Sequence, residues 1–255
     1  MNFRTLSVAA AMTLAAFAMP AGTGPASAQA MNDAQKQEMG DFIRSYLLEH
    51  PEILREMADK LEAKDQEAET LARTKGLSEQ KQLIFSHAGD AVVGNPKGDV
   101  TIVEFMDYNC GWCKRSVGEV QALLEKDKNL KVVFKEFPIF GPHSEFAAKA
   151  ALASIKQGKY WELHQALFAN EGQVTDEVVM NIATELGLDV NKLAEDMKDQ
   201  KVLDTVSENY DLAKTLKLNG TPAFIIDDQV YPGYLPLDQL QAAIADVRSN
   251  GCKLC

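Results

Sequence analysis

A pair of cysteines, Cys110 and Cys113, constrains the fold of this chain more than any other feature. The apolar run over residues 102–106 predicts a buried strand just before the pair. The two cysteines are therefore expected at the start of a helix, where unpaired N–H groups and a partial positive charge favour a thiolate over a thiol. Apolar residues at helical spacing after the pair support this placement: Val117, Val120 and Leu124.

The Cys-Gly-Trp-Cys spacing indicates thiol–disulfide chemistry. A free cysteine thiol has a pKa near 8.5, and a helix start commonly lowers it to roughly 3.5–7.5. Two intervening residues bring the sulfurs within bonding reach in one turn, so the pair can cycle between dithiol and disulfide. We expect Cys110, nearer the helix start, to be the attacking thiolate and Cys113 to be the resolving thiol.

Other interpretations stay open when the residues are taken alone. A Cys-x-x-Cys pair can be half of a zinc site, which usually needs further ligands, or a short structural disulfide. A second pair, Cys252 and Cys255, lies at the end of the chain, where residues are usually mobile. That pair can form a local disulfide, which we expect to be accessory, or relay electrons to the first pair. The strand-then-helix context favours redox chemistry for Cys110 and Cys113.

Residues 1–28 predict a secretion signal. Arg4 precedes an apolar run over residues 6–19, and small residues lead to a cleavage pattern at Ala28, with Ala30 as the neighbouring choice. The run is shorter than the ~20 apolar residues that span a bilayer, and no other stretch approaches that length. We expect an exported, soluble protein of the bacterial periplasm, an oxidising compartment in which cysteine pairs hold or exchange disulfides.

The acidic composition argues against two kinds of partner. The chain has 26 Lys and Arg against 37 Asp and Glu, for a net charge of −11. No basic cluster suggests nucleic acid, and an acidic surface is unfavourable for binding anionic membranes. We therefore expect no nucleic-acid partner.

Residues 29–88 predict a helical N-terminal arm. Pro51 follows His50 and should end one helix and begin the next. A segment this short cannot bury an apolar stripe alone, so the stripe packs either on the rest of the chain or on copies of itself. Polar residues near 74–82 indicate a joint after the arm. The stripe consists of Phe42, Ile43, Leu47, Leu54, Met57 and Leu61.

Residues 89–251 follow an α/β pattern, and residues 252–255 form a short tail. A helical crossover joins the second and third strands, so these two should be parallel neighbours. Thr221 and Pro222 separate a helical region from a β-hairpin. The expected elements in order are strands at 92–93 and 101–106, the cysteine helix, a strand at 131–135, helices over 144–216, a hairpin at 223–231 and a helix at 237–248.

This order resembles the thioredoxin fold with a helical insertion. With Val103 to Arg115 around the cysteines and Gly220-Thr-Pro-Ala-Phe later, the chain resembles the DsbA family of periplasmic thiol–disulfide oxidoreductases. The stretch from Phe42 to Leu54 resembles the arm of the ScsC-like branch of that family. The resemblance covers nearly all of the chain after residue 28. It implies an α/β protein in which a helical arm precedes a thioredoxin fold with an inserted helical domain.

The resemblance also implies roles for individual residues. Cys110 would be the nucleophile and Cys113 its resolving partner, with Pro222 a cis-proline that faces them. Backbone groups of Thr221 can then pair with an extended substrate.

Glu104 is an acid within an otherwise apolar strand. It is either an outward-facing surface carboxylate or a buried acid that assists proton transfer at Cys113, as the family's matching glutamate is thought to do. Lys135, on the neighbouring strand, is a candidate ion-pair partner for Glu104.

Gly111 and Trp112 stand where the strong oxidants of the family carry Pro-His. Loss of that histidine removes a donor that would stabilise the Cys110 thiolate. We therefore expect a less depressed pKa, a less oxidising disulfide and easier reshuffling of substrate disulfides. Thr221 points the same way, since isomerases of this superfamily often have threonine before the proline.

The sequence thus predicts a periplasmic thiol–disulfide oxidoreductase that acts on protein disulfides and leans to isomerase or reductase. We expect no bound cofactor and no metal, only the redox-active Cys110–Cys113 disulfide. The expected partners are unfolded or misoxidised exported proteins, a membrane redox partner, and further copies of the chain, with a trimer favoured by the resemblance. The alternatives are a dedicated dithiol oxidase re-oxidised by a membrane partner, or a copper-handling or chaperone protein that uses the cysteine pairs.

Overall fold

The computed structural model describes residues 31–254. The expected secretion signal and Cys255 lie outside the described residues. The chain divides into two compact units, with the boundary between Asp59 and Lys60. Within the described residues, no helix is both long and apolar enough to cross a membrane.

The first unit contains α1 (Asp33–Glu49) and the beginning of α2 (Glu52–Glu79). Asn32 caps α1 by accepting a hydrogen bond from the Gln35 N–H, and the Gln35 side chain accepts one from the Asn32 N–H, a capping box. The chain breaks between the two helices at Pro51, as the sequence predicts. No residue of α1 is buried.

The second unit begins with the rest of α2 and with α3 (Lys81–Ser86). The stretch 74–82, predicted to be a joint, contains the junction between α2 and α3 at Gln80, but the rest of it is helical and part of it is packed. Leu77 is buried, and Gly76 lies so close to Leu216 that an added Cβ would meet its Cδ2 at 3.0 Å. The Arg73 Nε also donates to the Leu216 carbonyl at 3.2 Å. The polar residues of the stretch line the solvent side of a helix.

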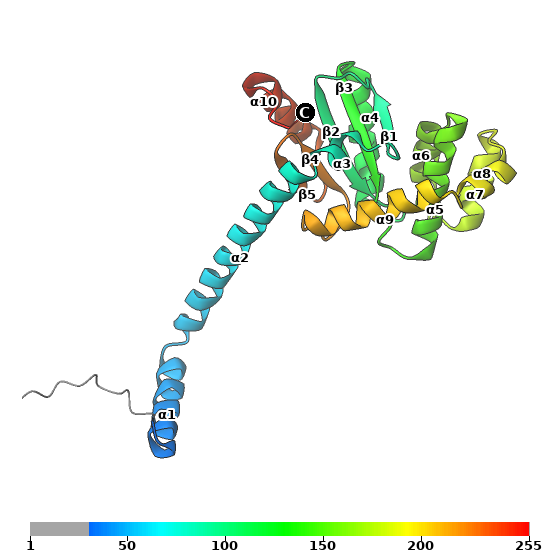
Figure 1. Ribbon diagram of the computed structural model, residues 1–255. Coiled ribbons are helices and arrows are strands. Elements are labelled where there is room, and N and C mark those ends of the chain that lie inside the picture. Colours follow the sequence, from blue (N-terminus) through cyan, green and yellow to red (C-terminus); the bar gives the residue numbers. More distant parts are fainter. Residues whose placement is uncertain (1–30, 255) are drawn as a thin grey trace, which may run out of the picture. The chain divides into compact units, whose positions relative to one another are not determined.

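Five strands form one mixed sheet in the order β1-β3-β2-β4-β5 (Figure 1). The two strands around the cysteine helix, β2 and β3, are parallel neighbours as predicted, and the other pairs are antiparallel. The strands are β1 (Ala91–Gly94), β2 (Val100–Met106), β3 (Leu130–Glu136), β4 (Ala223–Ile226) and β5 (Gln229–Pro232).

Helices cover both faces of this sheet (Figure 1). Apolar residues of α4 (Gly111–Lys126) and α10 (Leu237–Asn250) pack in the core on one face, together with Ile102 and Met106 of β2. On the other face, residues from α2 and α3 pack with Val103 and Phe105. The inserted helices are α5 (Pro142–Ser154), α6 (Tyr160–Ala169), α7 (Asp176–Glu185), α8 (Val190–Asp196) and α9 (Gln200–Thr215), with a 3₁₀ turn at Ile155–Gln157.

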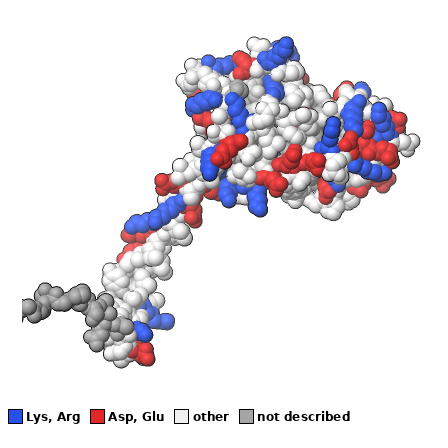
Figure 2. Space-filling view, in the orientation of Figure 1, with Lys and Arg blue, Asp and Glu red and all other residues white. Residues whose placement is uncertain are grey.

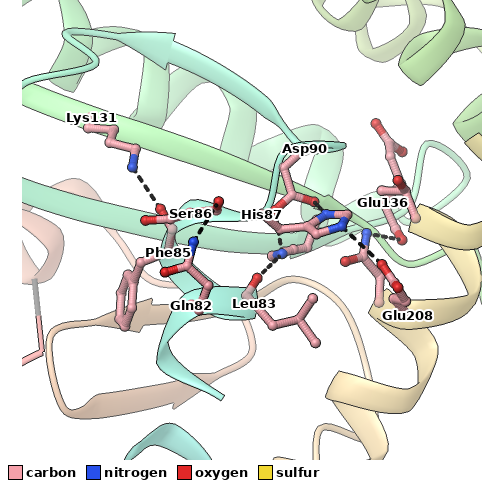
Figure 3. Close-up of polar contacts among 12 residues, drawn as sticks. Gln82, Leu83, Phe85, Ser86, His87, Asp90, Lys131, Glu136 and Glu208 are labelled. Atoms are coloured by element: carbon pink, nitrogen blue, oxygen red, sulfur yellow. Dashed lines mark hydrogen bonds and ion pairs between the residues drawn. The ribbon is translucent and has the colours of Figure 1, made fainter. Parts of the chain in front are cut away.

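Lysines of β3 fasten α3 to the sheet. Lys131 Nζ donates to the Phe85 carbonyl at 2.7 Å, and Lys135 Nζ donates to the Leu83 carbonyl at 2.5 Å (Figure 3). Carbonyl groups in the last turn of a helix have no partner within it, so both contacts satisfy groups that the helix leaves open. His87 follows α3 and bridges Asp90 to Glu208 of α9, with the closer contact, 3.0 Å, to Glu208.

The start of the C-terminal tail is fastened, contrary to the expectation of a mobile end. The N–H groups of Lys253 and Leu254 donate to Asp227 Oδ1 at 2.8 and 2.6 Å. Lys253 Nζ also donates to Asp228 at 2.6 Å. These contacts hold the tail, and Cys252 with it, against the turn between β4 and β5.

Basic and acidic side chains are interspersed on the visible face of the second unit (Figure 2). No large basic cluster is present on that face. This distribution agrees with the acidic balance of the chain and offers no surface there of the kind that binds a phosphate backbone.

Candidate active site

The end of β2 and the start of α4 place the two cysteines. Cys110 is the N-cap of α4 and has an extended backbone, with φ −87° and ψ 117°. Its N–H donates to the Asp107 carbonyl at 3.1 Å, which closes the turn after the strand. Cys110 and Cys113 are 4% and 1% exposed, and both are free thiols. The first helical turn therefore buries Cys113 and leaves Cys110 at the helix start.

The surroundings of Cys110 favour its thiolate. A hydrogen bond with the Cys113 thiol lowers the pKa of Cys110 to about 6, against the opposing effect of burial. The Thr221 side chain and the backbone N–H groups of Cys113 and Trp112 lower this pKa further. Helix N–H groups that have no helical partner thus stabilise the negative charge, as expected for a helix start.

The environment of Cys113 has the opposite effect. Burial raises the pKa of Cys113 well above its ordinary value, and hydrogen bonding to Cys110 and the charge of Glu104 add to the rise. A backbone hydrogen bond from Asp107 works in the other direction. The two thiols of one pair therefore differ strongly in acidity, which distinguishes an attacking sulfur from a resolving one.

Glu104 is buried, so the alternative of a surface carboxylate is wrong. The residue is 3% exposed on β2, and burial raises the pKa of its carboxyl to about 8. The nearby Ser116 side chain of α4 lowers this pKa, and the charge of Cys110 raises it. A carboxyl that titrates near neutral pH beside Cys113 can both accept and return a proton.

Replacing Glu104 with glutamine should change how stability depends on pH. Between the ordinary pKa of 4.5 and about 8, folded protein keeps a proton on Glu104 that unfolded protein has lost, so the free energy of unfolding falls as pH rises. Glutamine does not titrate. The free energy of unfolding of Glu104→Gln, taken relative to that of the parent protein, should therefore rise by up to about 4 kcal/mol between pH 5 and pH 8. Urea unfolding of the reduced proteins at both pH values measures this, with the exposed Glu125→Gln as control. Parallel pH profiles for Glu104→Gln and the parent protein would contradict a buried titrating carboxyl.

The suggested pairing of Lys135 with Glu104 is wrong. Lys135 lies opposite Phe105 in the register of β2 and β3, one residue beyond the pair of Glu104 with Phe134. Successive side chains of a strand point to opposite faces, so Lys135 and Glu104 lie on different sides of the sheet. Lys135 instead forms a fully buried ion pair with Asp90.

Thr221 and Pro222 lie beside Cys110. The peptide bond between them is cis, as the resemblance implies, and the Cys110 thiol donates to the Thr221 carbonyl at 3.2 Å. The Pro222 carbonyl accepts a hydrogen bond from the Gly233 N–H at 2.9 Å. The segment that leads into β4 therefore contacts the nucleophilic sulfur directly, although it is far from Cys110 in the sequence.

An aromatic and cationic cluster borders the site. Trp112 is 57% exposed, and its ring centre lies 5.7 Å from that of Tyr234. The Arg115 guanidinium carbon lies 5.8 Å from the Trp112 ring and 5.1 Å from the Tyr234 ring. Arg115 lies one turn after Trp112, so helical spacing could have indicated it. Nothing in the sequence indicated Tyr234, because only the tertiary fold brings the loop after β5 to this helix.

Two family models match the chain. The model described as a DSBA-like thioredoxin domain matches residues 101–245. The model described as the N-terminal domain of the copper resistance protein ScsC matches residues 35–68. The first match contains the cysteine pair and the segment at Pro222, and the second lies in the arm.

Solved structures agree with these matches. A thioredoxin-like oxidoreductase from Silicibacter pomeroyi DSS-3 is 43% identical, covers 66% of this chain and 97% of its own, and has a TM-score of 0.65. A linker-deletion mutant of Proteus mirabilis ScsC is 26% identical, covers 88% of this chain and 100% of its own, and has a TM-score of 0.67.

The curated relatives are longer proteins. The Na⁺/H⁺ antiporter NhaA 1 of Salinispora arenicola is 30% identical over 157 residues, which are 61% of this chain and 24% of that protein. The chain thus spans about a quarter of the length of the curated relatives that it matches.

Proposed function

Because this chain belongs to the family of DSBA-like thioredoxin domains, we propose that it is a thiol–disulfide oxidoreductase that leans to isomerase and reductase activity on protein disulfides. The observation that carries the proposal is the asymmetry of the pair. Cys110, beside Thr221, has a pKa lowered to about 6, whereas the pKa of Cys113 is raised. Such a pair attacks with one sulfur and resolves with the other.

The first step is attack by the Cys110 thiolate on a substrate disulfide. A new bond forms between Cys110 and one substrate sulfur, and the substrate disulfide breaks, so that its second sulfur leaves as a thiolate and takes up a proton. In the free protein the Thr221 carbonyl accepts a hydrogen bond from the Cys110 thiol at 3.2 Å. Once Cys110 has reacted, that carbonyl can accept a hydrogen bond from a backbone N–H of the bound substrate segment. The mixed disulfide is thereby held next to β4.

Two outcomes follow from the mixed disulfide. In reduction, Cys113 loses its proton to the Glu104 carboxylate and attacks Cys110. The bond between Cys110 and the substrate breaks, the substrate sulfur bonded there leaves as a thiolate and takes up a proton, and the Cys110–Cys113 disulfide remains. In isomerisation, another substrate thiolate attacks instead, and Cys110 leaves as a thiolate. The high pKa of Cys113 slows resolution and so allows time for isomerisation. Gly111 and Trp112 in place of Pro-His favour the same outcome.

The proposal includes a cellular setting and partners. The predicted signal at residues 1–28 supports export to a periplasm, where substrates would be unfolded or misoxidised exported proteins. The chemistry needs no bound cofactor, since the electrons reside in the cysteine pair. A membrane thiol–disulfide partner would restore the dithiol after each reduction.

The arm supports a further part of the proposal, assembly into a homo-oligomer. In the first unit, Phe42, Leu48 and Leu54 are 64%, 71% and 57% exposed. Helices that leave so much apolar surface open are typical of segments that associate. The resemblance of the arm to that of the ScsC-like branch is the reason to propose a trimer, in which several catalytic domains would act on one substrate.

Two measurements on the mature protein test the function together. The reduction potential of the cysteine pair comes from equilibration with glutathione, and isomerase activity comes from refolding of a ribonuclease with scrambled disulfides. We expect a potential near those of known isomerases, about −180 mV, and recovery of ribonuclease activity. A strongly oxidising potential near −120 mV, with no recovery from scrambled disulfides, would instead favour a dedicated dithiol oxidase.

A further inference from the structure

Side-chain contacts join the loop before Cys110 to the region of the inserted helices. Asp107 is 1% exposed, and its carboxylate accepts three hydrogen bonds. The Asn109 N–H and the Ser144 hydroxyl each donate to Oδ1 at 2.7 Å, and the Phe140 N–H donates to Oδ2 at 3.0 Å. Only the Asn109 contact lies within the loop itself. Ser144 belongs to α5, and Phe140 lies just before that helix.

Asn109 extends this connection to a second part of the insertion. Its Nδ2 donates to the Val174 carbonyl at 3.2 Å, and its Oδ1 accepts from the Val174 N–H at 2.8 Å. The Asn109 side-chain amide therefore makes two hydrogen bonds with the backbone of Val174, as a peptide group of a neighbouring strand would. Val174 lies between α6 and α7. Asn109 Nδ2 also donates to Ser144 Oγ at 3.1 Å, so one serine hydroxyl connects Asn109 and Asp107.

The main chain of Asp107 acts on both cysteines. Its carbonyl accepts a hydrogen bond from the Cys110 N–H at 3.1 Å, and its backbone lowers the pKa of Cys113. A shift of Asp107 therefore changes the donors around the pair. A turn that served only to end β2 could form all its hydrogen bonds with its own backbone. In this turn the Asp107 carboxylate, the Asn109 amide and the Ser144 hydroxyl are instead removed from water and hydrogen-bonded to connect the loop with the insertion.

We propose that Asn109 and Ser144 are positioning residues through which the inserted helical domain sets the reactivity of Cys110. The inference rests on the proposed thiol–disulfide chemistry of this site. By holding Asp107 and Asn109, the insertion keeps Cys110 extended at the helix start, with its sulfur near the N–H groups of Trp112 and Cys113. Those donors stabilise the thiolate only while the loop keeps this geometry.

The test compares substitutions that break the connection with one that does not. Asn109→Ala removes the pairing with Val174, and Ser144→Ala removes the hydroxyl between Asn109 and Asp107. Thr175→Ala is the matched control, because Thr175 caps α7 next to Val174 through a hydrogen bond from the Val178 N–H at 3.3 Å. Ser144→Thr keeps the hydroxyl and serves as the rescue.

The readouts are the pKa of Cys110, from the pH dependence of thiolate absorbance in the full reduced protein, and the melting temperature. We expect Asn109→Ala and Ser144→Ala to raise the Cys110 pKa by about 0.5 or more, which lowers the thiolate fraction at pH 5 about threefold. Thr175→Ala and Ser144→Thr should keep the parental pKa.

The inference is overturned if Asn109→Ala and Ser144→Ala lower the melting temperature but keep the parental pKa of Cys110, since their role is then structural. It is also overturned if Thr175→Ala raises the pKa as much as they do, or if Ser144→Thr fails to restore it. The pKa is measured without a protein substrate. Failure of the parent protein in the isomerase assay would therefore count against the proposed function and leave this result standing.

Discussion

Replacing Cys110 with serine should abolish disulfide exchange, whereas replacing Cys113 with serine should leave the first attack intact and trap substrates as mixed disulfides. With a pKa of about 6, Cys110 is roughly nine-tenths thiolate at pH 7, while the raised pKa of Cys113 keeps it protonated. Loss of a nucleophile typically costs about a thousandfold or more in rate. Reduction of a disulfide-bonded peptide measures the first effect, and non-reducing electrophoresis detects the trapped species.

Alkylation of the reduced parent protein provides the control for these assignments. At pH 6 a thiol reagent should label Cys110 well before Cys113, because only the thiolate reacts. Mass spectrometry of the peptides separates the two sites. Equal labelling, or trapped mixed disulfides in the Cys110→Ser variant, would reverse or remove the assigned roles.

Placing charges on the apolar stripe of the arm should dissociate the oligomer and remove most isomerase activity. Leu54 and Leu61 are 57% and 61% exposed, so Leu54→Asp with Leu61→Asp should leave each chain folded. Burial of carboxylates between helices is strongly unfavourable, so assembly should fail. Since linked catalytic domains gain effective concentration, we expect isomerase activity to fall about tenfold or more, with dithiol oxidation unchanged.

Light scattering and the two activity assays measure these effects. Arg55→Asp with Glu62→Asp is the matched control, because both residues are exposed and lie one position further along the same helix. That variant should remain oligomeric. If the parent protein is monomeric, the proposal of a homo-oligomer is wrong. If the Leu54→Asp, Leu61→Asp variant is still oligomeric, the apolar stripe does not form the interface.

The local parts of the fold were readable from the sequence. The apolar run of β2, the helical spacing after Cys113 and the turn at Asp227 are signals carried by neighbouring residues, and each element formed where its signal lies. The break between α1 and α2 also follows from one residue, Pro51. The position of the cysteines at a helix start depends only on such local patterns, so the chemistry of the pair could be predicted early.

The environment of the site depended on pairing across the sheet. Glu104 could be a surface or a buried acid until the helix that carries Ser116 covered its face of β2. Lys135 was a plausible partner for Glu104 because the register between β2 and β3 was unknown, and a difference of one residue places it on the opposite face with Asp90.

What the sequence determined by itself is the reactive pair and the order of elements around it, because spacing, turns and apolar periodicity act over a few residues. Only the tertiary structure decided which groups surround that pair. It brought the Thr221 carbonyl to the Cys110 sulfur, Tyr234 to Trp112, and Ser144 and Val174 to the loop before Cys110. Those contacts join segments that are distant along the chain, and they form only when apolar burial on both faces of the sheet brings the segments together.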